Sequence, residues 1–195
     1  MSDNFKLQPI QNWLKKNNWF FYDHQLETLN QSINGYDILL IAPTGGGKTL
    51  AGFLPSLHDL INNNSPENKL HTLYISPLKA LTIDVHRNLT NPIEDQNLDI
   101  RVETRTGDTS SYKKNRQKNV PPHMLMTTPE SLALLLADIK AKEYFKSLRY
   151  LIIDEIHSLV NTKRGDLLSL NLSRLDTISP NCKRIGLSAT IKNKN

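Results

Sequence analysis

Short apolar runs alternate with amphipathic stretches along the chain, and this alternation limits the possible folds more than any other feature. The apolar runs show little internal alternation of polar and apolar residues, which is typical of parallel strands covered by helices on both faces. We predict buried strands at residues 37–42, 71–76, 124–127, 148–153 and 184–188, and a further strand at residues 99–104.

The stretches between these strands carry helical patterns. We predict helices at residues 50–61, 78–89, 129–137 and 165–178, and Pro129 stands at the first helical position, where proline is favoured. Alternating strands and helices imply an α/β fold, a three-layer domain around a mostly parallel central sheet. The 195 residues suit one such domain. We expect residues 1–34 to form an N-terminal helical segment and residues 35–195 to form the lobe that contains the sheet.

The strongest motif lies where the first predicted strand turns into the first long helix. Residues 42–49 read APTGGGKT and resemble a P-loop, although Ala42 stands where the usual pattern opens with glycine. Glycines let backbone N–H groups curl around an anion at the positive end of the helix. Lys48 would then reach the β- and γ-phosphates of ATP, and Thr49 would ligate Mg²⁺. The predicted ATP-binding residues here are Thr44, Gly45, Gly46, Gly47, Lys48 and Thr49. The alternative is a glycine-rich turn with an incidental lysine.

A pair of carboxylates ends the predicted strand at residues 148–153. Asp154 would hold Mg²⁺, which prefers one or two carboxylates together with phosphate oxygens. Glu155 would orient and polarise the attacking water, and His157 would sit one step beyond the active centre and pass on the nucleotide state. The alternatives are an acidic helix start for the two carboxylates and a plainly packed histidine for His157.

With these residues in place, the chain resembles a known family. The stretches APTGGGKT, DEIH and SAT are similar to motifs I, II and III of superfamily 2 helicases of the DExH type, whose lobes are RecA-like. Residues 76–89, 105–109, 127–136 and 162–167 resemble the Lhr class, the large helicase-related proteins. Within that class the chain is most similar to the bacterial ligase-associated DEXH-box helicases. The likeness runs from about Trp13 to Thr190.

The resemblance implies further site residues. Gln25 would contact adenine, unless it is simply an exposed helix residue. Ser188, Ala189 and Thr190 would couple hydrolysis to movement, with Ser188 and Thr190 hydrogen-bonded toward Asp154 and Glu155. The implied nucleic-acid-binding residues are Pro77, Lys79, Ala80, Gly107, Asp108, Thr109, Thr128, Pro129, Glu130 and Ser131.

Some features of these loops have a chemical explanation of their own. Backbone amides at the start of the helix that begins at Pro129, and the hydroxyls of Thr127 and Thr128, could meet phosphates without reading sequence. Against this, Thr-Pro and Gly-Asp are also common turn signals. The basic run at residues 113–118 is either a solvated helix face or a nucleic-acid contact.

Composition adds weaker constraints. The chain has 24 Lys and Arg against 19 Asp and Glu, a net charge of +5 that suits a polyanionic partner such as nucleic acid. Cys182 is the single cysteine, which excludes a disulfide within the chain and a cysteine metal cluster. Neither a signal peptide nor a membrane-spanning run is visible in the sequence, so we expect a cytoplasmic protein without a membrane partner.

The family resemblance also implies a missing part. Superfamily 2 motors use two RecA-like lobes, and arginine fingers from the second lobe stabilise charge on the γ-phosphate. Because the sequence ends shortly after motif III, we expect the N-terminal lobe only.

The function of this lobe would be that of the first lobe of a DNA-dependent ATPase or helicase in DNA repair, with ATP and Mg²⁺ as cofactors. Its partners would be single-stranded DNA or an RNA–DNA duplex, with a DNA ligase and a nuclease implied by resemblance. The alternatives are a nucleotide- and single-strand-binding module without turnover, and an unrelated P-loop switch ATPase.

Overall fold

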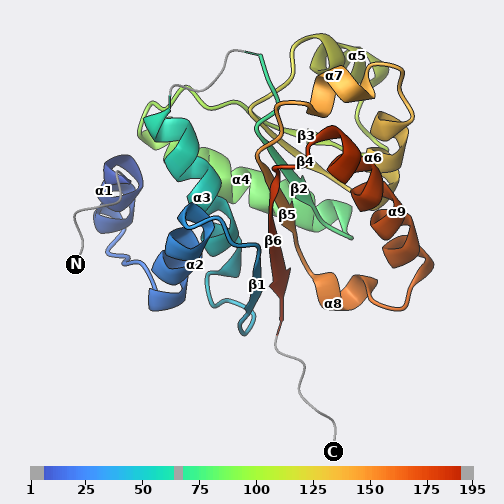
Figure 1. Cartoon of the computed structure of the whole chain (residues 1–195). Coiled ribbons are helices and arrows are strands. Elements are labelled where there is room, and N and C mark those ends of the chain that lie inside the picture. Colours follow the sequence, from blue (N-terminus) through green and yellow to red (C-terminus); the bar gives the residue numbers. More distant parts are fainter. Residues whose placement is uncertain (1–6, 64–67, 190–195) are drawn as a thin grey trace, which may run out of the picture.

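Six parallel strands form the central sheet in the computed structural model, which describes residues 7–63 and 68–189. The strand order is β1-β6-β5-β2-β4-β3 (Figure 1). The strands are β1 Ile38–Ile41, β2 Thr72–Ile75, β3 Val102–Arg105, β4 Met124–Thr127, β5 Tyr150–Ile153 and β6 Lys183–Ser188. All six predicted strands are therefore confirmed, and no end differs from its prediction by more than three residues.

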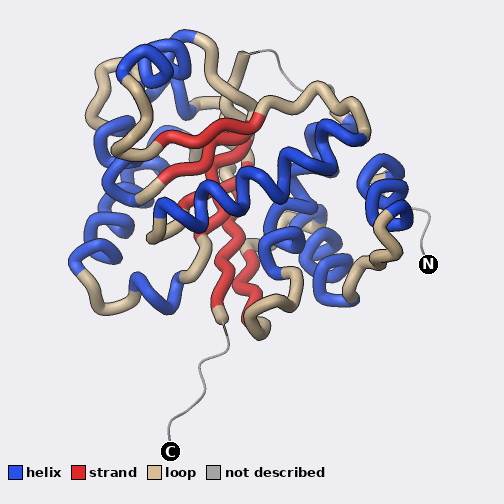
Figure 2. The backbone as a smooth tube through the Cα atoms, turned by 180° about the vertical axis from the view of Figure 1, so that it is seen from behind, coloured by secondary structure: helices blue, strands red, loops and turns tan. Residues whose placement is uncertain are grey.

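Helices lie on both sides of this sheet, as Figures 1 and 2 show from opposite directions. The helices are α1 Gln8–Lys16, α2 Asp23–Ile33, α3 Lys48–Asn62, α4 Lys79–Asp95, α5 Ser111–Asn119, α6 Pro129–Leu136, α7 Ala141–Phe145, α8 Ile156–Leu159 and α9 Lys163–Ile178. The three-layer α/β prediction is confirmed. The helical segment expected before the first strand consists of α1 and α2 in the described part of residues 1–34.

Each face of the sheet has its own hydrophobic core, because successive side chains of a strand point to opposite faces. On one face, α1 to α4 cover a cluster that includes Tyr74 of β2 and Ile152 of β5. On the other face, α6 to α9 cover a cluster that includes Leu73 of β2 and Leu151 of β5. This double cover explains why β2, β4 and β5 are buried at every position.

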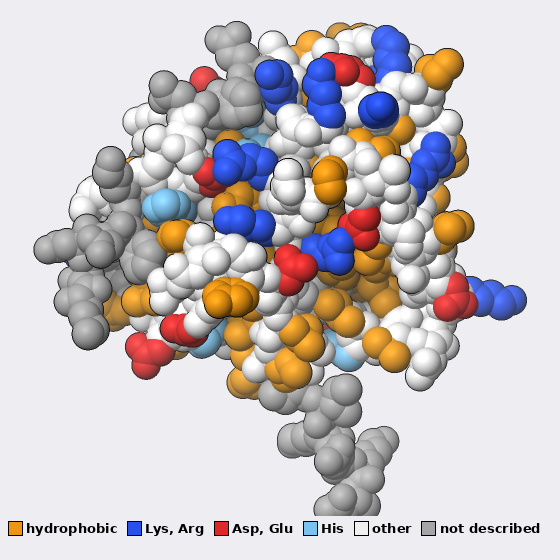
Figure 3. Space-filling view, viewed as in Figure 1, with side chains coloured by type: hydrophobic (Ala, Val, Ile, Leu, Met, Phe, Trp, Pro, Cys, Tyr) orange, Lys and Arg blue, Asp and Glu red, His pale blue; other side chains and the backbone are white. Residues whose placement is uncertain are grey.

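The edge strand β1 differs from the prediction of a fully buried strand. Ile38 and Leu40 pack against the first core, but Leu39 and Ile41 on the opposite face are 61% and 57% exposed. In the described ranges no helix covers that face of β1, and hydrophobic side chains gather over the lower ends of β1 and β6 in Figure 3. The apolar run therefore predicted the strand correctly, but the prediction that helices cover both faces of β1 is wrong for the face of Leu39 and Ile41.

One helix is longer than predicted, and another was not among the four predicted helices. α4 continues past residue 89 through Pro92 to Asp95. The basic run at residues 113–118 lies on α5, a helix with one buried residue, Gln117. Over the part of the chain that the structure describes, no helix is long and apolar enough to cross a membrane.

Candidate nucleotide-binding and nucleic-acid-binding site

The predicted site residues lie at one edge of the sheet. All six strands run parallel, so the residues that follow them meet at the carboxyl edge, where ligands bind in open α/β sheets. Hydrogen bonds fix the neighbours there: Ala42 N–H donates to Ser188 O at 3.2 Å, and Asp154 N–H donates to Ile75 O at 2.9 Å. The predicted P-loop, carboxylates and motif III are thus brought together.

The loop from Ala42 to Lys48 has the backbone of a phosphate cradle. Gly45 and Gly47 have φ angles of 80° and 70°, which favour glycine, and Gly47 caps α3. A Cβ at Gly47 would lie 2.5 Å from Nε2 of Gln25. The loop therefore requires glycine at this position both for its backbone conformation and for its close approach to α2.

Lys48 is a buried cation without a carboxylate partner among the described residues. Its side chain donates to the carbonyls of Ala42 at 2.8 Å and Pro43 at 3.0 Å, and the residue is 7% exposed. A buried ammonium group held only by neutral carbonyls favours an anion beside it. A phosphate fits this position, whereas an incidental lysine in a turn leaves its burial unexplained.

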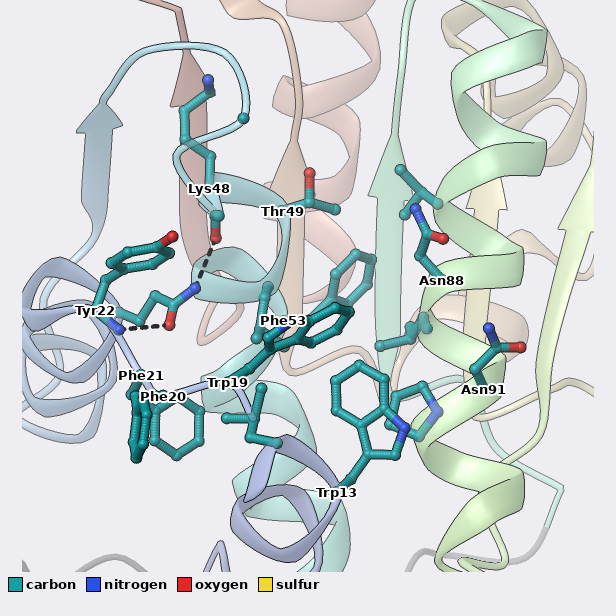
Figure 4. Close-up of a pocket in the computed structure, with 18 of the residues that line it drawn as sticks. Trp13, Trp19, Phe20, Phe21, Tyr22, Lys48, Thr49, Phe53, Asn88 and Asn91 are labelled. Carbon is teal, nitrogen blue, oxygen red and sulfur yellow. Dashed lines mark hydrogen bonds between the residues drawn. The ribbon is translucent and has the colours of Figure 1, made fainter. Parts of the chain in front are cut away.

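Gln25 connects the start of α2 to this loop. Its Oε1 accepts from Tyr22 N–H at 2.9 Å, and its Nε2 donates to Gly47 O at 3.1 Å (Figure 4). The residue is 2% exposed, so the alternative of an exposed helix residue is wrong. One Nε2 hydrogen is left for another acceptor, and the contact with adenine stays a prediction.

Asp154 is held from two sides. Glu155 N–H donates to its Oδ1 at 2.8 Å, and the hydroxyl of Tyr74 donates to its Oδ2 at 2.6 Å. Burial and then the charge of Asp154 raise the pKa of Tyr74 above its ordinary value, so the hydroxyl keeps its proton and remains a donor. Tyr74 was not among the predicted site residues; the signal in the sequence was a tyrosine inside a buried strand, whose hydroxyl needs a partner.

Glu155 and His157 lie just after Asp154 and contact each other. Glu155 is the N-cap of α8 and has a left-handed backbone (φ 51°, ψ 41°), a strained conformation for a residue with a side chain. Its Oε2 lies 3.1 Å from Nε2 of His157. Ala189 N–H donates to Nδ1 of His157 at 3.3 Å, which leaves Nε2 as the ring donor to Glu155.

Motif III meets the carboxylates through this histidine. The hydroxyl of Ser188 lies 3.2 Å from Nδ1 of His157, so the expected bond from Ser188 toward Asp154 and Glu155 is replaced by one to the ring beside them. Ser188 ends β6 and is 7% exposed, and its hydroxyl also donates to Ala189 O at 3.1 Å. Thr190 lies outside the described residues.

Only two residues, Thr49 and Asp154, are proposed to hold Mg²⁺, and this ion typically takes few ligands from the protein itself. Thr49 offers a hydroxyl at the start of α3 and Asp154 offers a carboxylate with free lone pairs, both hard oxygen donors. The described residues contain no group of three or more His, Cys, Asp or Glu that could hold a metal by itself. The donor set therefore fits an ion whose remaining ligands are phosphate oxygens and water.

A cavity of about 880 Å³ joins these groups. Lys48, Thr49, Asp154 and Glu155 line one part of it. Figure 4 shows that it continues between Trp13 and Trp19 on one side and Asn88 and Asn91 of α4 on the other. The phosphate cradle thus opens into an aromatic compartment with two amides, which suits the flat ring system of a nucleoside base.

The loops predicted to bind nucleic acid lie farther along the same edge and contain two ion pairs. The ammonium group of Lys79 lies 2.9 Å from each carboxylate oxygen of Asp108. Glu130 pairs with Arg164 of α9 at 2.5 and 3.1 Å, and hydrogen bonds from Arg164 lower the pKa of Glu130. The pairing of Glu130 with Arg164 was not anticipated from the sequence.

The hydroxyls of Thr127 and Thr128 do not face solvent, contrary to expectation. Thr127 is fully buried and donates to Arg105 O at 2.8 Å, while Thr128 caps α6 by accepting from Ser131 N–H. Both side chains shape the loop rather than offer hydroxyls to a phosphate. The exposed members of the predicted set are Lys79, Ala80, Gly107, Asp108 and Glu130, whereas Pro77, Thr128, Pro129 and Ser131 are buried.

Comparisons with known proteins agree with this geometry. The ATP-dependent helicase Lhr-Core of Methanocaldococcus jannaschii is 42% identical over 94% of this chain and 23% of the relative. The structure of Mycobacterium smegmatis helicase Lhr bound to ssDNA and AMP-PNP superposes with a TM-score of 0.84 at 38% identity, over 98% of this chain and 25% of that one. The DUF1998 helicase MrfA superposes with a TM-score of 0.85 at 29% identity, over 99% of this chain and 30% of that one.

The chain thus spans less than a quarter of the length of the Lhr-Core relatives that it matches. The expected likeness to the Lhr class is confirmed, and the narrower likeness to ligase-associated helicases stays a prediction. The model of the DEAD/DEAH box helicase family matches residues 22–195. By the match over most of its length and by the site at its sheet edge, this chain belongs to the DEAD/DEAH box helicase family.

Proposed function

We propose that this chain is the ATP-binding and nucleic-acid-binding first lobe of a DNA-dependent ATPase or helicase that acts in DNA repair. Residues 35–195 would form the RecA-like lobe, and residues 1–34 would add the helical segment that contacts the nucleotide base. The observation that carries the proposal is the buried ammonium group of Lys48, which has only carbonyl partners among the described residues at the mouth of the cavity.

The side chains divide the work. Lys48 turns from the carbonyls of Ala42 and Pro43 to the β- and γ-phosphates, whose charge it balances better than neutral carbonyls can. Thr49 and Asp154 would hold Mg²⁺, and the ion would neutralise charge on the phosphates when bound. Glu155, oriented by His157, accepts a proton from the attacking water.

The nucleic acid would cross the exposed loops of the same edge. Lys79, Ala80 and the loop of Gly107, Asp108 and Thr109 offer a cation and backbone amides, which bind phosphates without reading sequence. Single-stranded DNA or an RNA–DNA duplex is the proposed substrate, in line with the ssDNA bound to Mycobacterium smegmatis helicase Lhr in its structure. A DNA ligase and a nuclease as partners, and a cytoplasmic location, are predictions from the sequence alone.

A binding module without turnover is the second candidate. Among the described residues that line the cavity, Lys48 is the one cation and no arginine is present. Hydrolysis by this family type is expected to need an arginine that stabilises charge on the γ-phosphate. The lobe by itself would then bind nucleotide and a single strand with little hydrolysis.

The test is equilibrium binding of a fluorescent ATP analogue to the wild-type chain and to Lys48→Ala. Because Lys48 would form a charge-assisted bond to phosphate, we expect at least about tenfold weaker binding in the variant. Lys142→Ala, which removes an exposed lysine on α7, is the matched control and should bind as the wild type does. Equal affinity in Lys48→Ala and wild type would contradict the proposal.

Hydrolysis separates the two candidates. Turnover that single-stranded DNA stimulates and that Glu155→Gln abolishes would support the ATPase. Binding without measurable turnover would support the module.

A further inference from the structure

We infer that Tyr74 is a positioning residue that sets the orientation of the Asp154 carboxylate for Mg²⁺, and that it joins both elements that would hold the ion. The inference rests on the proposed nucleotide-binding function. Tyr74 has no part in any of the motifs that carried the family resemblance.

The strand register places the two side chains together. Tyr74 of β2 pairs with Ile152 of β5, and Asp154 follows two residues later on the same face of the sheet. The hydroxyl of Tyr74 therefore reaches diagonally across to Oδ2 of Asp154, with an O···O distance of 2.6 Å. Tyr74 is 1% exposed and Asp154 is 5% exposed, so water does not compete strongly for this bond.

The bond fixes the plane of the carboxylate. Oδ1 already accepts from Glu155 N–H at 2.8 Å, so the two oxygens are each held by one donor from opposite ends. Each oxygen keeps a second lone-pair direction. Without the hydroxyl, rotation about the Cβ–Cγ bond would cost Asp154 only the backbone contact, and Oδ2 would be left without a donor in a buried position.

The ring of Tyr74 is held by the helix that carries the other proposed ligand. Phe53 of α3 stacks on Tyr74 with a centroid distance of 5.3 Å and an interplanar angle of 26°. Phe53 lies one helical turn after Thr49, at the start of the same helix. Tyr74 thus contacts the Thr49 helix through its ring and Asp154 through its hydroxyl, and it fixes the relative placement of the two oxygen donors.

The test measures the Mg²⁺ requirement of nucleotide binding rather than turnover. A fluorescent ATP analogue is titrated onto the chain in EDTA and at increasing Mg²⁺, for wild type and Tyr74→Phe. Partners of metal ligands typically contribute 10- to 100-fold to metal affinity. We expect Tyr74→Phe, which keeps the ring and its contact with Phe53, to raise the Mg²⁺ concentration for half-maximal effect about tenfold, with unchanged affinity in EDTA.

Two controls and a second test variant accompany this measurement. Tyr144→Phe removes another buried hydroxyl, one that has no hydrogen-bond partner among the described residues, and it should leave the Mg²⁺ requirement unchanged. In an Asp154→Asn background, Tyr74→Phe should add no further shift. Phe53→Leu keeps the hydroxyl but releases the ring, and it should shift the requirement in the same direction, which keeps the test open if Tyr74→Phe folds poorly.

The outcomes are distinct. An unchanged Mg²⁺ requirement in both Tyr74→Phe and Phe53→Leu, or an equal loss of affinity with and without Mg²⁺, would overturn the positioning role and leave the proposed function standing. Absence of Mg²⁺-dependent nucleotide binding in the wild type would overturn the proposed function, and the inference with it.

Discussion

The imidazole of His157 lies between the end of β6 and the carboxylate of Glu155. Nδ1 accepts from Ala189 N–H, and Nε2 lies 3.1 Å from Oε2 of Glu155. A shift of Ala189, directly after β6, would therefore move the ring, and the ring would move the carboxylate. At the scale of single residues, these two contacts connect motif III to the carboxylate that is proposed to act on the attacking water.

We expect His157→Ala to lower ATP hydrolysis about 10- to 100-fold, because a small misplacement of a reacting group costs that much. Nucleotide affinity should stay within about twofold, since the imidazole touches no group proposed to hold phosphate. The measurement is the initial rate of phosphate release with single-stranded DNA, beside binding of the ATP analogue. His86→Ala, a histidine of α4 bonded to Val102 O, is the control. Equal losses in rate and affinity would argue for a general structural defect.

The last turn of α3 is joined to the starts of two strands by one buried carboxylate. Asp59 Oδ2 lies 2.8 Å from Nε2 of His71 beside β2 and 3.2 Å from Nε of Arg149 beside β5. Oδ1 accepts from the side chain of Asn63. Burial alone would raise the pKa of Asp59, but the bonds from His71 and Asn63 and the charge of Arg149 outweigh it, so the pKa is lowered.

We expect Asp59→Asn to lower the free energy of unfolding by about 1–3 kcal/mol at pH 7, because buried partners lose a charged acceptor. A carboxyl with a lowered folded pKa contributes stability above its unfolded pKa, about 3.9, and loses it as the pH falls through the folded value. The difference between wild type and variant should therefore shrink below about pH 4. Urea unfolding between pH 7 and pH 3 measures it.

The control is Asp95→Asn, which breaks an exposed pair with Lys16 and should cost well under about 1 kcal/mol. A difference for Asp59→Asn that stays constant with pH would show that the contact depends on shape rather than charge.

Elements of this fold differ in how far their sequence determines them. The strand at residues 124–127 was predicted to the residue, because a buried parallel strand is apolar throughout. The short helices α7 and α8 were not predicted, since five and four residues are too few to show a helical period.

The candidate site shows the same division. Lys48 and Asp154 could be placed from local pattern, because each follows a strand of a parallel sheet. The bonds of Asp154 to Tyr74 and of His157 to Ser188 could not be placed, because they join segments far apart in the chain and depend on side-chain packing.

The chain as a whole carries a net charge of +5, but carboxylates neutralise part of the positive charge where nucleic acid is proposed to lie. Asp108 pairs with Lys79, and Glu130 pairs with Arg164, so two cations at these loops are each matched by a carboxylate from another segment. Both members of the Lys79 pair are largely exposed, and such pairs contribute little to stability. A phosphate that binds Lys79 competes with Asp108 for the same ammonium group, so we expect the ion pair to reduce the affinity for nucleic acid modestly.

We expect Asp108→Asn to strengthen binding of a single-stranded oligonucleotide about two- to fivefold, because Lys79 is released and a repelling charge is removed. Lys79→Ala should weaken binding and reduce the slope of log affinity against log salt by about 0.7, the value for one lost phosphate contact on a single strand. Fluorescence anisotropy at several salt concentrations measures both effects. Glu94→Gln removes an equal charge at the far end of α4 and is the matched control. If Glu94→Gln strengthens binding as much as Asp108→Asn does, then net charge alone governs the affinity for the oligonucleotide, and the ion pair between Lys79 and Asp108 does not weaken binding.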